Sequence, residues 1–222
     1  MNKIYIPATK PEDWRQFLAK PKKHWRSKYS AKELAYSWQN ANGFPESVKK
    51  VFKQSNIKLF ENVELLLAIP EYKVSLPGDA RPAQNDIFIL AKGDNQLISI
   101  MVEGKVAEPF GDTVGEWIIN ASKGKHKRLE YLCNKLQIDK SSIDLIRYQL
   151  IHRTASAIIE AEKFNTGNAM MMVHSFSEND EGFNDYEQFL ALYDIKDVNP
   201  NSIIFVKHIN GVNIYSCWVK EK

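Results

Sequence analysis

The feature of this sequence that most constrains its fold is a pair of apolar segments, 86–91 and 97–106, joined by a short polar loop. The first reads DIFILA, and its β-branched and aromatic residues favour a strand. The second reads LISIMVEGKV, and its apolar stretch runs almost unbroken to Val102, which is typical of a strand covered on both faces. Gly93 and Asn95 in the loop suit a short hairpin turn. The two segments therefore predict a β-hairpin inside a sheet that has helices on both sides.

The rest of the chain predicts an α/β fold with a central mixed β-sheet flanked by helices. Ser30 and Glu33 have the spacing of a capping box at the start of a helix that Asn42-Gly43 ends. Pro45 is expected to open a second helix. The remaining expectations are a β segment over 63–76, a turn at Pro77-Gly78-Asp79, helices over 113–121, 125–136 and 142–164, a strand over 169–176, a helix over 186–193, and a hairpin over 203–219 around Asn210-Gly211. Strands followed by helices and a returning strand imply a mixed sheet.

Charge divides the chain unevenly. Residues 1–60 hold 13 Lys and Arg against 4 Asp and Glu, although the net charge of the whole chain is only +3. Residues 1–29 are interpreted as a basic, irregular N-terminal arm, and residues 30–222 as a single domain. The aromatic residues among these lysines, Trp14, Trp25, Tyr29 and Trp38, could help the arm to follow a phosphate backbone. Alternatively, the lysines are simply solvated and the aromatic side chains pack on the domain.

Composition indicates a cytoplasmic protein. Hydrophobic residues make up 44% of the chain, which is ordinary globular usage. No apolar run reaches the ~20 residues that span a bilayer, and the first residues show no secretory signal, so no membrane partner is expected. Cys133 and Cys217 have no metal-ligand spacing and are expected to be free, buried thiols.

Three polar residues on the central hairpin stand out as a candidate site. Glu103 and Lys105 are two apart on one strand, so their side chains share a face. A carboxylate and an amine on a strand that is buried on both faces are costly unless they are paired or serve a function. Asp86 begins the preceding strand, and an antiparallel turn at 93–95 brings it beside the other two. The sequence therefore predicts one polar cluster of two acids and an amine.

These residue types suit hydrolysis of a phosphodiester. Asp86 and Glu103 offer the hard oxygen ligands that Mg²⁺ prefers, and Mn²⁺ would be an alternative ion. A bound ion lowers the pKa of a water ligand and neutralises phosphate charge. Lys105 can orient that water or stabilise developing negative charge. The competing interpretation is that Glu103 and Lys105 form a structural ion pair and Asp86 caps a turn.

The pattern also resembles a known superfamily. Asn85-Asp86 followed by Glu103-Gly104-Lys105 resembles the D…ExK signature of the PD-(D/E)XK nucleases, whose fold is restriction-endonuclease-like. The order of elements over about residues 30–176 is similar to their αβββαβ core, with residues 177–222 as a C-terminal extension. The resemblance implies metal ligation by Asp86 and Glu103, catalysis by Lys105, and action on DNA.

Members often add a glutamate from a helix before the strands. Glu33 is the best-placed candidate for this role and Glu64 the second. Asn85 stands where proline is common in the superfamily. The whole chain is also similar to an uncharacterised group of bacterial proteins, through segments such as RYQLIHRTASA.

Further residues are candidates for substrate binding. Arg147, Gln149, His152 and Arg153 fall on the predicted helix over 142–164, and they either line the substrate cleft or bond to loop carbonyls. A basic cluster over 123–128 could dock phosphate or be a solvated helix start. His174 is expected to be a satisfied core histidine.

Two functions follow from these expectations. The first is a Mg²⁺-dependent nuclease that acts on DNA. The second is a catalytically inactive nuclease-like fold that serves as a nucleic-acid or protein interaction module. The sequence leaves open whether the chain forms a homodimer.

Overall fold

The computed structural model describes residues 8–18, 21–26, 29–78 and 81–221. Its centre is one six-stranded sheet with strand order β1-β2-β3-β4-β6-β5. The strands are β1 (Glu64–Val74), β2 (Ala83–Gly93), β3 (Gln96–Lys105), β4 (Asn168–Ser175), β5 (Ile203–Ile209) and β6 (Val212–Lys220). β1, β2 and β3 form an antiparallel meander, β3, β4 and β6 are parallel, and β5 is antiparallel to β6. The predicted α/β class with a mixed sheet is confirmed.

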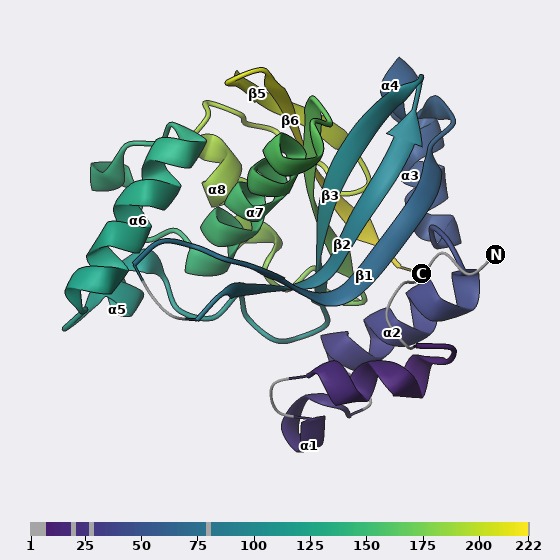
Figure 1. The fold of residues 1–222 in the computed structure, drawn as a ribbon, viewed down its shortest axis with the longest axis horizontal. Coiled ribbons are helices and arrows are strands. Elements are labelled where there is room, and N and C mark those ends of the chain that lie inside the picture. The colour runs from purple at the N-terminus through teal and green to yellow at the C-terminus, as the bar shows by residue number, and fades with distance from the viewer. Residues whose placement is uncertain (1–7, 19–20, 27–28, 79–80, 222) are drawn as a thin grey trace.

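Helices cover both faces of this sheet (Figure 1). One face carries α5 (Val114–Ile118), α6 (Lys123–Leu136), α7 (Tyr148–Phe164) and α8 (Phe183–Ala191). The other face carries α2 (Ser30–Ala41), α3 (Glu46–Gln54) and α4 (Lys58–Glu61). The shorter elements are η1 (Pro11–Phe17), α1 (Pro21–His24) and η2 (Lys140–Ser142). The α7 helix is the crossover between the parallel strands β3 and β4, as a parallel connection requires.

The sheet separates two hydrophobic clusters, and strand alternation decides which residues enter each. Phe88 and Met101 face α7, whereas Ile87 and Val102 face α2 and α3. All four side chains are fully buried. Each such side chain contributes roughly 1.5–3 kcal/mol when it leaves water. The continuous apolar stretch before Glu103 is therefore explained by helices that cover both faces of β3.

Both predicted hairpin turns are present and are tight. Asp94 and Asn95 connect β2 to β3 with φ values of 44° and 59°. Asn210 and Gly211 connect β5 to β6 with φ values of 49° and 83°. Two consecutive positive φ values are the requirement of a type I′ turn, whose twist matches that of the flanking strands. The loop expected over 92–96 is shorter than predicted, because β2 and β3 continue to Gly93 and from Gln96.

The helix α2 begins at Ser30 as predicted, but its predicted cap is wrong, and so is the predicted start of the long helix. Tyr29, not Ser30, is the N-cap residue of α2, and no side chain caps it. The Ser30 N–H instead donates to Glu108 Oε1 at 2.8 Å, so a distant loop supplies the acceptor. The long helix begins at Tyr148 rather than at residue 142, because the backbone of Arg147 is extended. By contrast, Thr113 caps α5 with Glu116 in a complete capping box, as expected from its residue type.

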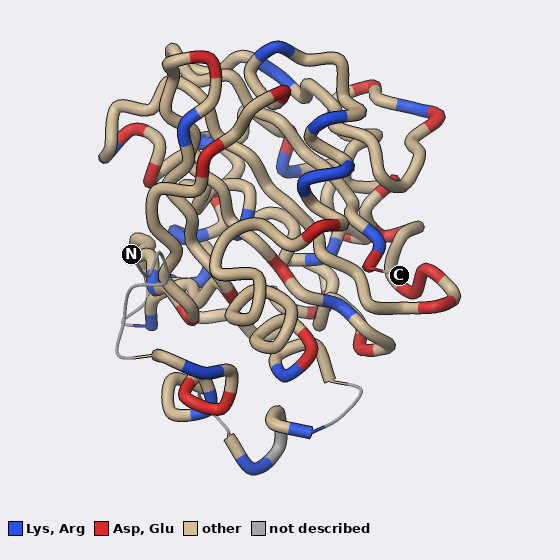
Figure 2. The backbone as a smooth tube through the Cα atoms, turned by 90° about the vertical axis from the view of Figure 1, so that its right-hand side faces the viewer, with Lys and Arg blue, Asp and Glu red and all other residues tan. Residues whose placement is uncertain are grey.

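The N-terminal segment is more ordered than predicted where the structure describes it. It contains η1 and α1, and Trp14 is buried with its indole N–H donating to Gln39 Oε1 at 2.8 Å. Packing of Trp14 on the domain agrees with the second interpretation of these aromatic residues. Along the described backbone, Lys and Arg lie interspersed with Asp and Glu in the view of Figure 2. Residues 1–7, 19–20 and 27–28 of the predicted arm, and Asp79 of the predicted turn, lie outside the described residues.

Candidate functional site

The candidate site is built on the end of the β1–β2–β3 meander. Ile87 pairs with Val102, so the next step along the ladder places Asp86 opposite Glu103. Residues that lie directly opposite in an antiparallel pair share a face, and this face is the one that α7 covers. Asp86 and Glu103 therefore lie side by side, as the hairpin predicted. Lys105 lies two residues further along β3 on the same face.

A third acid extends this row across the sheet. Pro70 pairs with Ile87 and Tyr72 pairs with Asn85, so Glu71 falls opposite Asp86. Its φ of 53° departs from strand geometry, and its carboxylate accepts a hydrogen bond from Gln84 Nε2. We call Glu71, Asp86 and Glu103 the acidic row. Like charges opposite one another on adjacent strands are destabilising, so the row requires nearby cations.

Two cations meet the acidic row. Lys105 Nζ lies 2.7 Å from Glu103 Oε1, and Arg153 Nε donates to Glu103 Oε2. Arg153 Nη2 also lies 3.3 Å from Asp86 Oδ1, so one guanidinium contacts two members of the row. Glu103, Lys105 and Arg153 are each no more than 4% exposed. Removing charges from water costs several kcal/mol per ion, so such a cluster is weak evidence for stability and favours a functional role.

Burial and the neighbouring charges shift the pKa values of all three acids in the acidic row. Burial, and then the neighbouring Asp86, raise the pKa of Glu71 to about 8. Burial, and then Glu103, raise the pKa of Asp86 to about 6. Burial also acts to raise the pKa of Glu103, but Arg153 and Lys105 outweigh it and lower that pKa to about 2. The acids are therefore not equivalent: Glu103 is firmly ionised, whereas the other two lack sufficient positive charge nearby.

These groups open into a cavity of about 510 Å³. Its lining combines the acidic row, Lys105 and Arg153 with the start of α2 and the loop after β3. Asp86 keeps 21% of its side-chain surface exposed. Gln149 on α7 also lines this cavity, and its Oε1 lies 3.2 Å from Lys105 Nζ. The Lys105 ammonium lies 4.5 Å from the Phe110 ring centroid as well, so its position is fixed from three sides.

Of the four predicted substrate-binding residues, two line the cavity and two do not. Gln149 and Arg153, four apart on α7, share the face that lines the cavity. Arg147 does not line it: Nε bonds Asp185 at 3.0 Å and Nη1 bonds the Gly111 carbonyl at 2.9 Å. His152 is buried away from the cavity, and burial lowers its pKa well below the ordinary range. The prediction is thus wrong for His152, while Arg147 follows the loop-carbonyl alternative.

Neither predicted helical glutamate reaches the acidic row. Glu33 on α2 lines a separate groove together with Tyr36 and Glu178. Glu64 pairs with Lys92 at the hairpin end of the sheet, remote from Asp86 along β2. The third acid is instead Glu71, which was not predicted. A weak signal for it existed, because Glu71 and Asp86 lie seven and eight residues from Gly78, the middle of the turn predicted at 77–79.

For the basic cluster over 123–128, phosphate docking and a solvated helix start were the two alternatives, and two of its side chains instead contact the protein itself. Arg128 is buried and its Nη2 donates to the Arg81 carbonyl at 2.6 Å. Lys125 donates to the Trp117 carbonyl and lies over the Trp117 ring. These two side chains therefore tie α6 to neighbouring loops.

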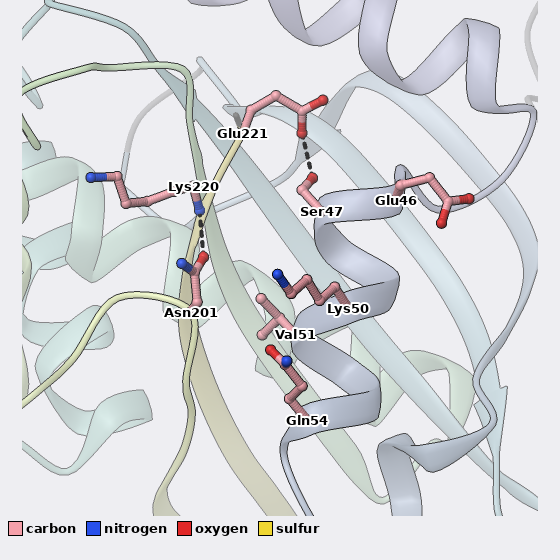
Figure 3. A pocket seen from close by; sticks show the side chains of 8 residues that line it. All are labelled: Glu46, Ser47, Lys50, Val51, Gln54, Asn201, Lys220 and Glu221. Carbon is pink, nitrogen blue, oxygen red and sulfur yellow. Dashed lines mark hydrogen bonds between the residues drawn. The ribbon is translucent and has the colours of Figure 1, made fainter.

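A second groove, of about 420 Å³, lies between α3 and the end of β6 (Figure 3). Ser47 and Glu221 line this groove, and both contact the buried His174 behind it, an arrangement that superficially resembles a hydrolase triad. Trp38 Nε1 donates to His174 Nδ1 at 3.0 Å, so Nδ1 is an acceptor, and in the neutral ring the proton lies on Nε2. That Nε2 lies 2.8 Å from Glu221 Oε2, to which Ser47 also donates. His174 therefore cannot accept a proton from Ser47, and its predicted role as a satisfied core histidine is confirmed.

The donor chemistry of the acidic row fits a hard divalent cation. Mg²⁺ is commonly held by one or two carboxylates, with water and substrate phosphate completing its shell. Asp86 and Glu103 offer two such groups on neighbouring strands. Among the described residues, no group of three or more His, Cys, Asp or Glu side chains converges to hold a metal. The fit therefore depends on two carboxylates, and Arg153 now contacts both of them.

Comparison with known protein families identifies the family of this chain. Residues 7–222 match the model of a domain of unknown function, DUF6946. The chain belongs to this family. No curated protein and no solved structure matches it. Within the described part of this DUF6946 chain, no helix has the length and apolar character needed to cross a bilayer. Membership of DUF6946 carries no known activity, so the function of the site must be argued from its chemistry.

Proposed function

We propose that this DUF6946 protein hydrolyses phosphodiester bonds in DNA with a divalent cation, Mg²⁺ or Mn²⁺, held at the acidic row. The observation that carries the proposal is the meeting of Asp86, Glu103 and Lys105 on adjacent strand ends in one cavity. Such a cluster matches the chemical needs of the reaction: oxygen ligands for the ion and a positive group beside it. The cytoplasm is the proposed compartment.

The order of elements supports the same proposal. A helix, an antiparallel three-stranded meander, a crossover helix and a parallel strand occur in this order as α2, β1–β3, α7 and β4, with α3 and α4 before the meander and α5, α6 and η2 after it. This is the αβββαβ order expected from the resemblance to PD-(D/E)XK nucleases. Asp86 lies on the second strand and Glu103-Gly104-Lys105 at the end of the third. The resemblance rests on these motif residues and on this order, and no match to a solved structure adds to it.

Each residue has a defined role in the proposed reaction. Asp86 and Glu103 would hold the cation, which when bound activates water and neutralises phosphate charge. Lys105 would orient the attacking water and stabilise negative charge on the phosphate, and Gln149 keeps its ammonium in place. Arg153 would bind a phosphate oxygen, for which a guanidinium is well suited.

The test is a plasmid-nicking assay with Mg²⁺ or Mn²⁺. Wild type is compared with Lys105→Ala and Asp86→Asn, and with Glu130→Ala as a control at an exposed position on α6. We expect a loss of at least ~100-fold in the first two variants, the range of one electrostatic or general acid–base group, and no change in the control. Equal cleavage by all four proteins, or none by the wild type, would remove the proposal.

A second function is favoured by one specific observation. Arg153 contacts both Asp86 and Glu103, which suits a nuclease-like fold that binds nucleic acid or protein without catalysis. Titration calorimetry with Mn²⁺ separates the two functions. Binding that Asp86→Asn abolishes supports the hydrolase, whereas no binding by the wild type supports the interaction module.

A further inference from the structure

Arg153 occupies the position between carboxylates that a metal ion would use. Its Nε contacts Glu103, its Nη2 lies 3.3 Å from Asp86, and the side chain is 5% exposed. Its remaining nitrogen, Nη1, is buried and has no hydrogen-bond partner among the residues that the structure describes. The guanidinium thus bridges two acids while one of its donors is unused.

A divalent cation and this guanidinium cannot both occupy the gap. A divalent ion and a guanidinium held this close together repel each other strongly. Both oxygens of Glu103 already contact a cationic side chain, Oε1 that of Lys105 and Oε2 that of Arg153. A cation that binds both carboxylates must therefore displace Arg153. The cavity of about 510 Å³ beside the row provides space for the displaced side chain.

A phosphodiester supplies what the displaced arginine needs. The guanidinium presents its donors in a planar fork that matches two phosphate oxygens, and a charge-assisted pair of this kind is strong. We propose that Arg153 is a resident counter-ion that a divalent cation displaces from Asp86 and Glu103, and that the phosphodiester then receives it, so that cation and DNA bind with positive cooperativity. This inference rests on the proposed function, since it assumes a cation at the acidic row.

The structural alternative is that Arg153 is a permanent bridge. In that case Arg153 stays in contact with Asp86 and Glu103 at all times. Replacing it then leaves the two acids unpaired and has no effect on cooperativity between the cation and DNA. The two alternatives predict different rankings of Mn²⁺ affinity among the wild type and the Arg153 variants. These affinities can be measured without any catalytic turnover.

The experiment is titration calorimetry with Mn²⁺ on wild type, Arg153→Gln and Arg153→Lys. Arg147→Gln is the matched control, because Arg147 is a paired arginine at the start of the same helix but contacts Asp185 instead of the row. We expect Kd to fall at least ~10-fold in Arg153→Gln. Arg153→Lys should give an intermediate Kd, because an ammonium is a compact point charge that lacks the planar fork with which a guanidinium bridges both acids. The control should keep the wild-type Kd.

Cooperativity is tested in a Lys105→Met background, in which cleavage is disabled. A short DNA duplex should tighten Mn²⁺ binding several-fold when Arg153 is present and should leave it unchanged in Lys105→Met/Arg153→Gln. By linkage, Mn²⁺ should tighten DNA binding by the same factor. Equal tightening with and without Arg153 would overturn the inference.

The other outcomes are also decisive. If wild type binds Mn²⁺ through Asp86 and a folded Arg153→Gln binds with equal or weaker affinity, the counter-ion role is wrong and the proposed hydrolase stands. If neither protein binds Mn²⁺, both proposals fall. Should Arg153→Gln fail to fold by circular dichroism, the Arg153→Lys series decides, and an unchanged Kd there overturns the role.

Discussion

Asp86 Oδ2 accepts a hydrogen bond from the backbone N–H of Gly104 at 2.8 Å. This bond links the acid of β2 to the middle residue of the Glu103-Gly104-Lys105 segment. It leaves Oδ1 facing Arg153 and the cavity. The orientation of Asp86 is therefore set by backbone geometry as well as by charge, and the spacing of the motif controls both.

Gly104 should tolerate only a small side chain. A side chain at this position would point toward α2, where an added Cβ would lie 3.3 Å from Leu34 Cδ2 and 3.4 Å from Ser30 Cβ. Gly104→Val should therefore lower the free energy of unfolding by about 1–3 kcal/mol through overpacking, and Gly104→Ala by less. Urea denaturation measures both. Equal stability of Gly104→Val and wild type would show that α2 does not restrict this position.

Removing the Glu103 carboxylate should be costly. Glu103→Ala leaves Arg153 and Lys105 buried beside each other without the acid that pairs them. Breaking a buried pair from one side costs about 3–5 kcal/mol. The matched control, Glu130→Ala on the exposed face of α6, should change stability by less than ~0.5 kcal/mol. Similar urea midpoints for the two variants would contradict the burial of this network.

The acidic row predicts that stability falls as pH rises from about 4.5 to 8. The folded-state pKa values of Glu71, about 8, and Asp86, about 6, lie above their ordinary values of 4.5 and 3.8. The folded protein thus keeps protons that the unfolded chain releases, and the free energy of unfolding declines through this window. Glu103 acts oppositely: its pKa of about 2 means that its contribution is lost as pH falls below 4.5.

Glu71→Gln isolates the larger part of this effect, because the amide cannot titrate. Its unfolding free energy should decline less steeply than that of wild type between pH 4.5 and 8 in urea melts. Glu130→Gln, at an exposed position, should follow the wild-type curve. If the curves of Glu71→Gln and wild type ran parallel across the window, Glu71 would not be the titrating group.

Trp38 should be required for the state of His174. Trp38→Phe removes the indole donor, leaves the buried Nδ1 without its hydrogen bond, and should cost about 1–3 kcal/mol beyond the lost ring volume. Nitrogen NMR of the imidazole should report a proton on Nε2 in the wild type. A proton on Nδ1 in the wild-type ring would refute the hydrogen-bond direction.

Ser47→Ala should leave any phosphodiesterase activity unchanged, because Ser47 lies outside the cavity of the acidic row.

The local sequence was sufficient to predict the strands of the hairpins and the proximity of Asp86 to Glu103. The alternation and the turn residues between 86 and 106 predicted a hairpin, and a hairpin with a known turn has a fixed register. Asp86, Glu103 and Lys105 could therefore be brought together from their spacing alone. The same reasoning predicted the Asn210-Gly211 turn, because only a few residue types accept positive φ at both positions.

Tertiary structure decided what surrounds those three residues. Glu71 joins the row through a longer connection that does not fix register, and Arg153 arrives from a helix that passes over the sheet. The α2 cap is also a tertiary contact, with Glu108 in place of the local box expected from Ser30 and Glu33. Spacing along the chain determines which residues share a strand face, since that depends on backbone geometry. Which charges meet across elements depends on how helices dock, and the packing of the whole core fixes that docking.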